Sequence, residues 1–184
     1  VNGLNIPGLL DAQTDSTLIG TIQKNVDAVR TVDGAPHINH PNFGWAIDQE
    51  SLLRVNHYRL LEIFNGHPLV NNFGGGDKPG MEEVWDFLLS SGKLVYGIAV
   101  DDAHHFKEEF GPARSNPGKG WVVVRAKSLS AAEIIQHLED GLFYASTGVV
   151  LDDIIVEKKR IEIRIKQKSD TRFQTDFIGN NGRL

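Results

Sequence analysis

The sequence contains no cysteine, and this absence excludes several kinds of covalent bond, metal ligand and catalytic group. Disulfide bonds, thiolate metal ligands and a cysteine nucleophile are all excluded. Any metal ion bound by the protein must therefore be held by histidine, aspartate or glutamate.

The sequence also lacks long apolar runs and any block of charge of one sign. No stretch approaches the roughly 20 apolar residues that a membrane-spanning helix needs, and residues 1–8 do not resemble a signal peptide. The 19 basic and 24 acidic residues are scattered along the chain. We therefore expect no membrane span and no nucleic-acid groove, while the compartment stays open.

Strand-like and helix-like segments alternate through most of the chain. Residues 16–31 carry apolar residues at helical spacing. Strands are predicted at 59–64, 94–100 and 121–126, the last buried on both faces. A helix separates the first two strands, and a polar loop of residues 105–120 precedes the third. Ser130 and Glu133 predict a capping box at the start of a further helix. Alternation at this spacing favours βαβ units around a parallel sheet or barrel.

The last part of the sequence changes character. Strand-like runs follow one another with no helix between them, at 149–156, 160–166 and 173–178. The middle run alternates isoleucine with charged residues, which is typical of a sheet with one wet face. We predict a small antiparallel β appendage of residues 149–184 on a main domain of residues 1–148.

Two carboxylates and two imidazoles, in Asp101-Asp102-Ala103-His104-His105, follow directly on the predicted strand 94–100. The C-terminal ends of strands are where α/β folds place their sites. On extended backbone the side chains of Asp102 and His104 would point to the same side and converge on a metal. A solvated loop with a helix-capping aspartate is the alternative explanation.

A second candidate lies in Pro36-His37-Ile38-Asn39-His40-Pro41. His37 and His40 would share a face only in a helix, which the two prolines disfavour. Only one of them is therefore expected to be a ligand. For His37 we expect a hydrogen-bonded side chain near the surface.

A third candidate is Glu62, a charged residue inside an otherwise apolar predicted strand. A buried carboxylate needs a cation, a metal or several hydrogen-bond donors. Glu62 is therefore either a site residue or an outward-facing edge residue. Asn65 ends the same strand, where its amide can orient a substrate, although turn formation also explains an Asn-Gly pair.

Three segments in order, His40-Pro41-Asn42, Leu61-Glu62-Ile63-Phe64-Asn65-Gly66 and Gly97-Ile98-Ala99-Val100-Asp101-Asp102-Ala103-His104-His105, resemble the last barrel-strand and metal-site motifs of the polymerase and histidinol phosphatase (PHP) superfamily. The closer resemblance is to CehA/McbA-type metallohydrolases, through residues 120–124 and 143–148. It covers most of residues 1–150.

The resemblance implies an α/β fold, the C-terminal part of a distorted (β/α)7 barrel, that carries two or three divalent ions such as Mn, Zn or Fe. The metal ligands that it implies are His40, Asp102 and His104. We assign Glu62, Asn65 and His105 to substrate binding. The implied activity is hydrolysis of a small-molecule substrate, most directly a phosphoester, by a metal-activated water.

The chain departs from the family at its beginning. The His-x-His pair, the acidic ligand and the further histidine that open such domains are not found before His37, so the chain is expected to start within the domain. We therefore predict that these 184 residues alone are inactive and bind divalent ions weakly. An open barrel wall would favour poor solubility or association with another copy of the chain.

A function of a different class is a non-catalytic, degenerate PHP barrel whose β appendage binds a ligand or a glycan. A His-x-His pair upstream in the encoding gene would favour the hydrolase, and its absence there would favour the binding protein.

Overall fold

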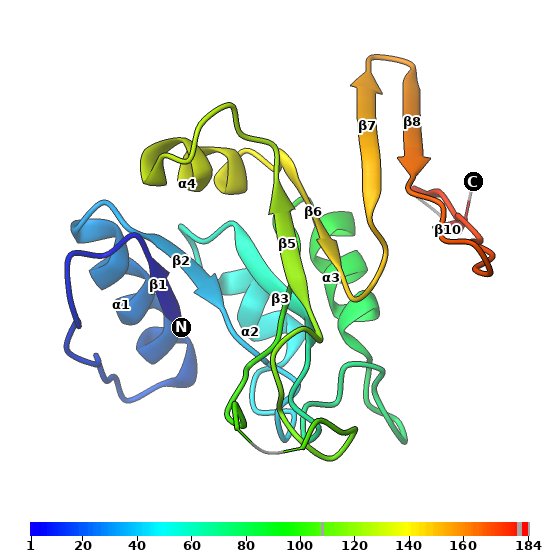
Figure 1. Cartoon of the computed structure of the whole chain (residues 1–184). Helices are drawn as coiled ribbons and strands as arrows, with labels where there is room; N and C mark the ends of the chain where they lie inside the picture. Colours follow the sequence, from blue (N-terminus) through cyan, green and yellow to red (C-terminus); the bar gives the residue numbers. More distant parts are fainter. Residues whose placement is uncertain (108, 180–181, 184) are drawn as a thin grey trace. The chain divides into compact units, whose positions relative to one another are not determined.

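The computed structural model describes residues 1–107, 109–179 and 182–183 of the chain. The chain divides into two units, Val1–Thr147 and Gly148–Leu184 (Figure 1). All the predicted site residues belong to the first unit.

A four-stranded sheet forms the centre of the first unit. Its strands lie in the order β1 (Asn2–Leu4), β2 (Ala35–Ile38), β3 (Leu60–Asn65) and β4 (Tyr96–Val100). Strand β1 runs antiparallel to β2, whereas β2, β3 and β4 run parallel to one another. The alternation of strands and helices predicts parallel strands, and this prediction is confirmed for β2, β3 and β4.

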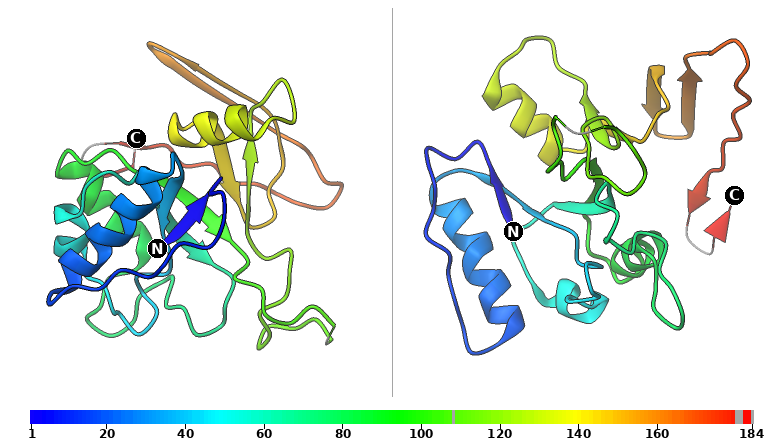
Figure 2. Two further views of the ribbon diagram at one scale, coloured as in Figure 1. Left: turned by 90° about the vertical axis from the view of Figure 1, so that its left-hand side faces the viewer. Right: turned by 60° about the horizontal axis from the view of Figure 1, so that its bottom comes forward.

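Three helices pack together on one face of this sheet (Figure 2): α1 (Leu18–Thr31), α2 (Gln49–Arg54) and α3 (Met81–Ser90). In α1 the buried residues Ile22, Val26 and Val29 recur at helical spacing and form one apolar stripe. Ile38 of β2 and Leu61 of β3 face the same core. Within the residues that the structure describes, no helix is long and apolar enough to span a membrane.

The other face of the sheet is covered by helix α4 (Ala131–Glu139) and the strand pair β5 (Trp121–Val124) and β6 (Phe143–Ser146). Leu60 and Ile98 from the sheet and Leu138 from α4 form the core on this side. Val123 of β5 remains 39% exposed. The prediction that this strand is buried on both faces is therefore wrong.

The predicted (β/α)7 barrel is also wrong. The described strands form one open four-stranded sheet and three separate two-stranded pairs, and they close no barrel. The departure from a barrel arises at β5 and β6, which pair antiparallel with each other instead of joining the parallel strands. Alternating strands and helices do not encode the direction in which the next strand runs. The expectation of an open barrel wall therefore no longer holds. The poor solubility or association that we inferred from such a wall has no support without it.

The start of α4 differs from its prediction as well. Ser130 is the N-cap residue but makes no side-chain capping hydrogen bond. Glu133 instead accepts hydrogen bonds from the backbone N–H groups of Lys127 and Ser128. The predicted capping box is therefore wrong, because the Glu133 carboxylate reaches past the N-cap into the preceding turn.

The chain turns sharply at Gly141, between α4 and β6. Its φ is +74°, and a Cβ atom there would lie 2.4 Å from the ring of Tyr96. We expect Gly141→Ala to lower the free energy of unfolding by about 2 kcal/mol or more, because the left-handed conformation disfavours a side chain and the ring would have to move.

Denaturant unfolding measures this loss of stability. The matched control is Gly8→Ala, because an added Cβ at Gly8 would meet no atom within 4 Å. The control should change stability by less than about 0.5 kcal/mol. Equal stabilities for the two variants would contradict the prediction.

The second unit contains an antiparallel hairpin of β7 (Leu151–Glu157) and β8 (Arg160–Ile165), and a short pair of β9 (Ile178–Gly179) and β10 (Gly182–Arg183). The hairpin matches two of the three strand-like runs in the tail. The prediction of a strand at 173–178 is wrong, because β9 begins only at Ile178. The residues before it are largely polar and make no apolar stripe.

Candidate functional site

The three parallel strands end at one edge of the sheet, and polar side chains meet there. His40 lies two residues after β2, Asn65 ends β3, and Asp102 lies two residues after β4. Asn65 Nδ2 donates to Glu62 Oε2 at 2.9 Å and to Asp102 Oδ2 at 3.2 Å. The backbone N–H of His40 donates to the same Glu62 oxygen at 2.8 Å. Hydrogen bonds thus connect four of the predicted residues from three strand ends.

A β-bulge in β3 brings Glu62 and Asn65 together. Residues three apart in a regular strand point to opposite faces. The register between β3 and β4 shifts between Glu62 and Phe64, so Glu62 pairs with Ile98 and Asn65 pairs with Val100. Ile98 and Val100 are two residues apart and share a face, and paired residues in a parallel sheet share it too. The bulge therefore places Glu62 and Asn65 on the same side of the sheet.

Glu62 is a buried carboxylate, only 3% exposed. Burial would raise its pKa, but hydrogen bonds from the side chains of His37 and Asn65, the charge of His37 and the N–H of His40 together lower the pKa below its usual value. Glu62 is therefore ionised and satisfied by several donors. Its burial excludes the outward-facing alternative.

His37 is the main partner of Glu62, with Nε2 at 3.2 Å from Oε1. It is 6% exposed, because β1 covers it: Asn2 pairs with His37 in the sheet, and Asn2 Nδ2 lies 3.0 Å from its Nε2. The prediction of a histidine near the surface is wrong. The sequence does not indicate that residues 2–4 would form a strand over it.

The backbone at Asp102 is left-handed, with a φ of +47°. The extended Asp-x-His segment predicted from the sequence is therefore wrong. The turn directs the Asp102 carboxylate toward Asn65 and leaves Oδ1 at 3.9 Å from His104 Nδ1. His40 is left-handed as well, with a φ of +26°. Residues other than glycine rarely adopt this conformation, and it is frequent at functional sites.

Hydrogen bonds favour opposite tautomers in the two adjacent histidines, His104 and His105. His104 Nδ1 lies 2.7 Å from the carbonyl oxygen of Asp102, which can only accept, so Nδ1 carries the proton and Nε2 keeps its lone pair. His105 Nδ1 accepts from the N–H of Ser115 at 3.1 Å, so in His105 the Nε2 atom carries the proton. His104 thus offers a lone pair on Nε2, and His105 offers an Nε2–H donor.

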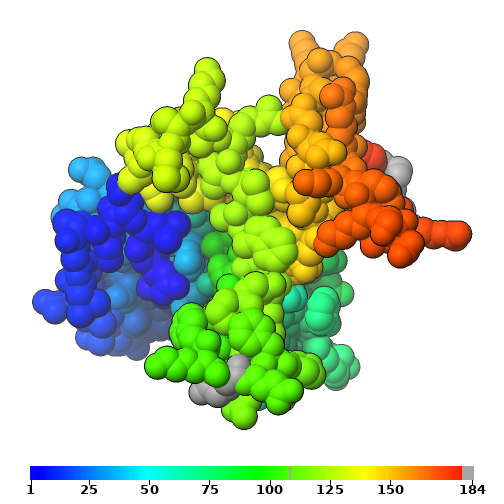
Figure 3. Space-filling model, in the orientation of Figure 1, coloured from blue at the N-terminus to red at the C-terminus, as the bar shows by residue number. Residues whose placement is uncertain are grey.

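Two buried residues that sequence reasoning missed, Ser115 and Asn116, hold this segment in place. The Ser115 carbonyl accepts from the backbone N–H groups of His104 and His105, and Asn116 Nδ2 donates to the His105 carbonyl. They belong to residues 109–120, which are green in the space-filling view (Figure 3). No sequence pattern marks them, because loop residues acquire such roles only when the loop folds back.

His67 is a further residue that sequence reasoning missed. Its ring centroid lies 5.4 Å from that of His104 and 6.3 Å from that of Phe43. Asn65 Oδ1 accepts from the backbone N–H of His67 at 2.8 Å, and His67 Nδ1 accepts from the N–H of Leu69. Neutral His67 therefore presents an Nε2–H donor. The sequence signal that could have identified His67 is its position just after the end of β3.

Asp102 and His104 carry donor types that fit a divalent ion. Asp102 offers a carboxylate and His104 a free Nε2 atom beside it. His37 adds a second indication: its buried Nδ1 has no hydrogen-bond partner within the described residues, while Nε2 faces Glu62, the carboxylate–histidine pairing of metal sites. No group of three or more histidine, aspartate or glutamate side chains is gathered around one point in the part of the chain that the structure describes.

Comparisons of the chain with family models, with curated proteins and with solved structures found no match. Its function is therefore inferred from its own residues and geometry.

Proposed function

We propose that this chain carries part of the active site of a metal-dependent hydrolase, most directly a phosphoesterase acting on a small-molecule substrate. One observation supports this proposal above the others. A hydrogen-bonded chain of polar groups, from His40 through Glu62 and Asn65 to Asp102, joins the C-terminal ends of three parallel strands. This edge is where sheets of parallel strands place their ligands and catalytic groups.

The residues divide into three roles in this proposal. Asp102, His104 and His40 would contribute ligands to different divalent ions, which when bound supply an activated water and stabilise charge on the scissile group. Glu62 and Asn65 fix the positions of His40 and Asp102. His105 and His67 offer Nε2–H donors to oxygen atoms of a substrate.

Turnover assays on the complete gene product test the proposal. A phosphomonoester, a phosphodiester and an aryl carbamate are each offered with Mn²⁺, Zn²⁺ or Fe²⁺, before and after treatment with a chelator. We expect hydrolysis of at least one phosphoester to disappear with the chelator and to return with added metal. Turnover that the chelator leaves unchanged would contradict the proposal, as would hydrolysis of none of the three substrates.

A further inference from the structure

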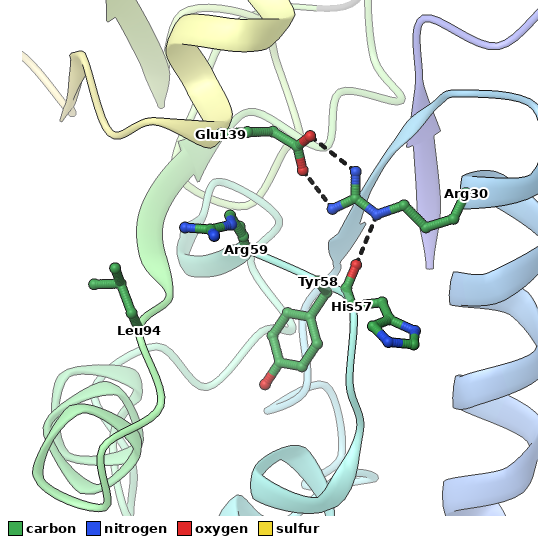
Figure 4. Close-up of a pocket in the computed structure, with 6 residues that line it drawn as sticks. All are labelled: Arg30, His57, Tyr58, Arg59, Leu94 and Glu139. Carbon is green, nitrogen blue, oxygen red and sulfur yellow. Dashed lines mark hydrogen bonds and ion pairs between the residues drawn. The ribbon is translucent and has the colours of Figure 1, made fainter.

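A polar pocket lies at the other edge of the parallel sheet, where β3 and β4 begin (Figure 4). Its volume is about 690 Å³, and it is lined by Arg30, His57, Tyr58, Arg59, Leu94 and Glu139. A pocket of this size suits a small organic molecule. None of these residues takes part in the candidate site described above.

One wall of the pocket is held in place by an ion pair between two helices. The guanidinium of Arg30, in α1, forms two hydrogen bonds with the carboxylate of Glu139, in α4, one of them at 2.8 Å. Arg30 Nε also donates to the carbonyl of His57 at 2.8 Å. The charge of Arg30 is therefore compensated, and its side chain is already positioned before any ligand arrives.

Arg59 carries the charge that is not compensated. It lies just before β3 and is exposed. Within the described residues its guanidinium makes no hydrogen bond or ion pair. Figure 4 shows its side chain in the pocket, between Glu139 and Leu94. Leu94, which is 55% exposed, also lines the pocket. Its side chain offers an apolar surface next to the charge of Arg59.

We propose that this pocket binds a small organic oxyanion, a carboxylate or a phosphate monoester, independently of the proposed hydrolase. The charged end of the ligand pairs with the guanidinium of Arg59, whose planar fork matches two oxygen atoms of such a group. The carbon skeleton lies against Leu94. The compensated Arg30–Glu139 pair forms the polar wall beside it.

Isothermal titration calorimetry with benzoate, phenylphosphonate and inorganic phosphate tests this proposal. A chelator is kept in the solution, so that no metal-bound anion contributes. We expect benzoate or phenylphosphonate to bind more tightly than inorganic phosphate, which lacks an apolar part. Which of the two binds more tightly identifies the ligand as a carboxylate or as a phosphate monoester.

Variants locate the binding. Arg59→Ala should weaken the affinity about tenfold or more, because a charged hydrogen-bonded pair is lost, and Arg59→Lys should weaken it less. The matched control is Arg54→Ala, which removes another exposed arginine outside the pocket and should leave the affinity unchanged. Binding by none of the probes up to about 10 mM would overturn the proposal. An affinity unchanged in Arg59→Ala, or weakened equally in Arg54→Ala, would also overturn it.

Discussion

Replacing Asp102 with alanine is expected to lower the kcat/KM of metal-dependent hydrolysis by about 100-fold or more. Loss of a group that merely orients a metal ligand costs about 10- to 100-fold, and Asp102 is proposed to be a ligand itself. The variant also removes one of the two acceptors of Asn65 Nδ2, the one that links the end of β3 to the segment after β4. Kinetics on the complete gene product measure the loss of kcat/KM. The affinity for Mn²⁺ measures the loss of the metal ligand.

Asp101→Asn is the matched control for this variant. Asp101 Oδ1 accepts hydrogen bonds from the backbone N–H groups of Lys119 and Gly120. An asparagine keeps that acceptor oxygen, so we expect little change in metal affinity. Asp102→Ala with kcat/KM like that of the unmodified protein would refute the assignment of Asp102 as a ligand.

Replacing Glu62 with glutamine should destabilise the fold by about 3 kcal/mol, because the buried carboxylate accepts from three donors that an amide cannot all satisfy. The donors are the ring of His37, the side chain of Asn65 and the backbone of His40. A glutamine side chain turns one acceptor oxygen into an NH₂ group, which would face another donor. Denaturant unfolding at neutral pH measures the loss.

The same variant should alter the dependence of stability on pH. The pKa of Glu62 is lowered in the folded chain, so its stabilising contribution is present above its unfolded pKa of about 4.3 and is lost as the pH falls through the folded value. The unmodified protein should therefore lose more stability than Glu62→Gln on acidification. Exposed Glu82 provides the control, since Glu82→Gln should leave both the stability and its pH dependence nearly unchanged. Parallel stability curves for Glu62→Gln and the unmodified protein would contradict the role given to the charge.

Local patterns predicted several helices and strands of the fold, but they did not indicate β1 or β6 or the pairing of β6 with β5. The apolar spacing of residues 16–31 corresponds to α1, and the runs 59–64 and 94–100 correspond to β3 and β4. These features depend on neighbours in the sequence. Whether β6 joins the sheet or turns back on β5 depends instead on packing between distant segments, which no local pattern carries.

In the candidate site, too, local patterns predict some features, and contacts between distant segments decide the others. Its polar residues at strand ends stand out in the sequence, and the burial of Glu62 decides between the two explanations open for that residue. His37 and His67 take their positions from contacts with β1 and with His104, which lie far away in the sequence. The roles of His104 and His105 depend on which ring nitrogen faces a carbonyl and which faces an N–H group.

The bulge in β3 makes the site depend on the number of residues as well as on their identity. Glu62 and Asn65 meet because β3 has one residue more between them than β4 has between their partners, Ile98 and Val100. If β3 paired with β4 without the bulge, every polar side chain would remain in the sequence, yet Glu62 and Asn65, three residues apart, would face opposite sides of the sheet. A related sequence that has these two residues only two apart in a regular strand would therefore keep them on one face without a bulge. The spacing of the two residues and the presence of the bulge must consequently be considered together when related sequences are compared with this one.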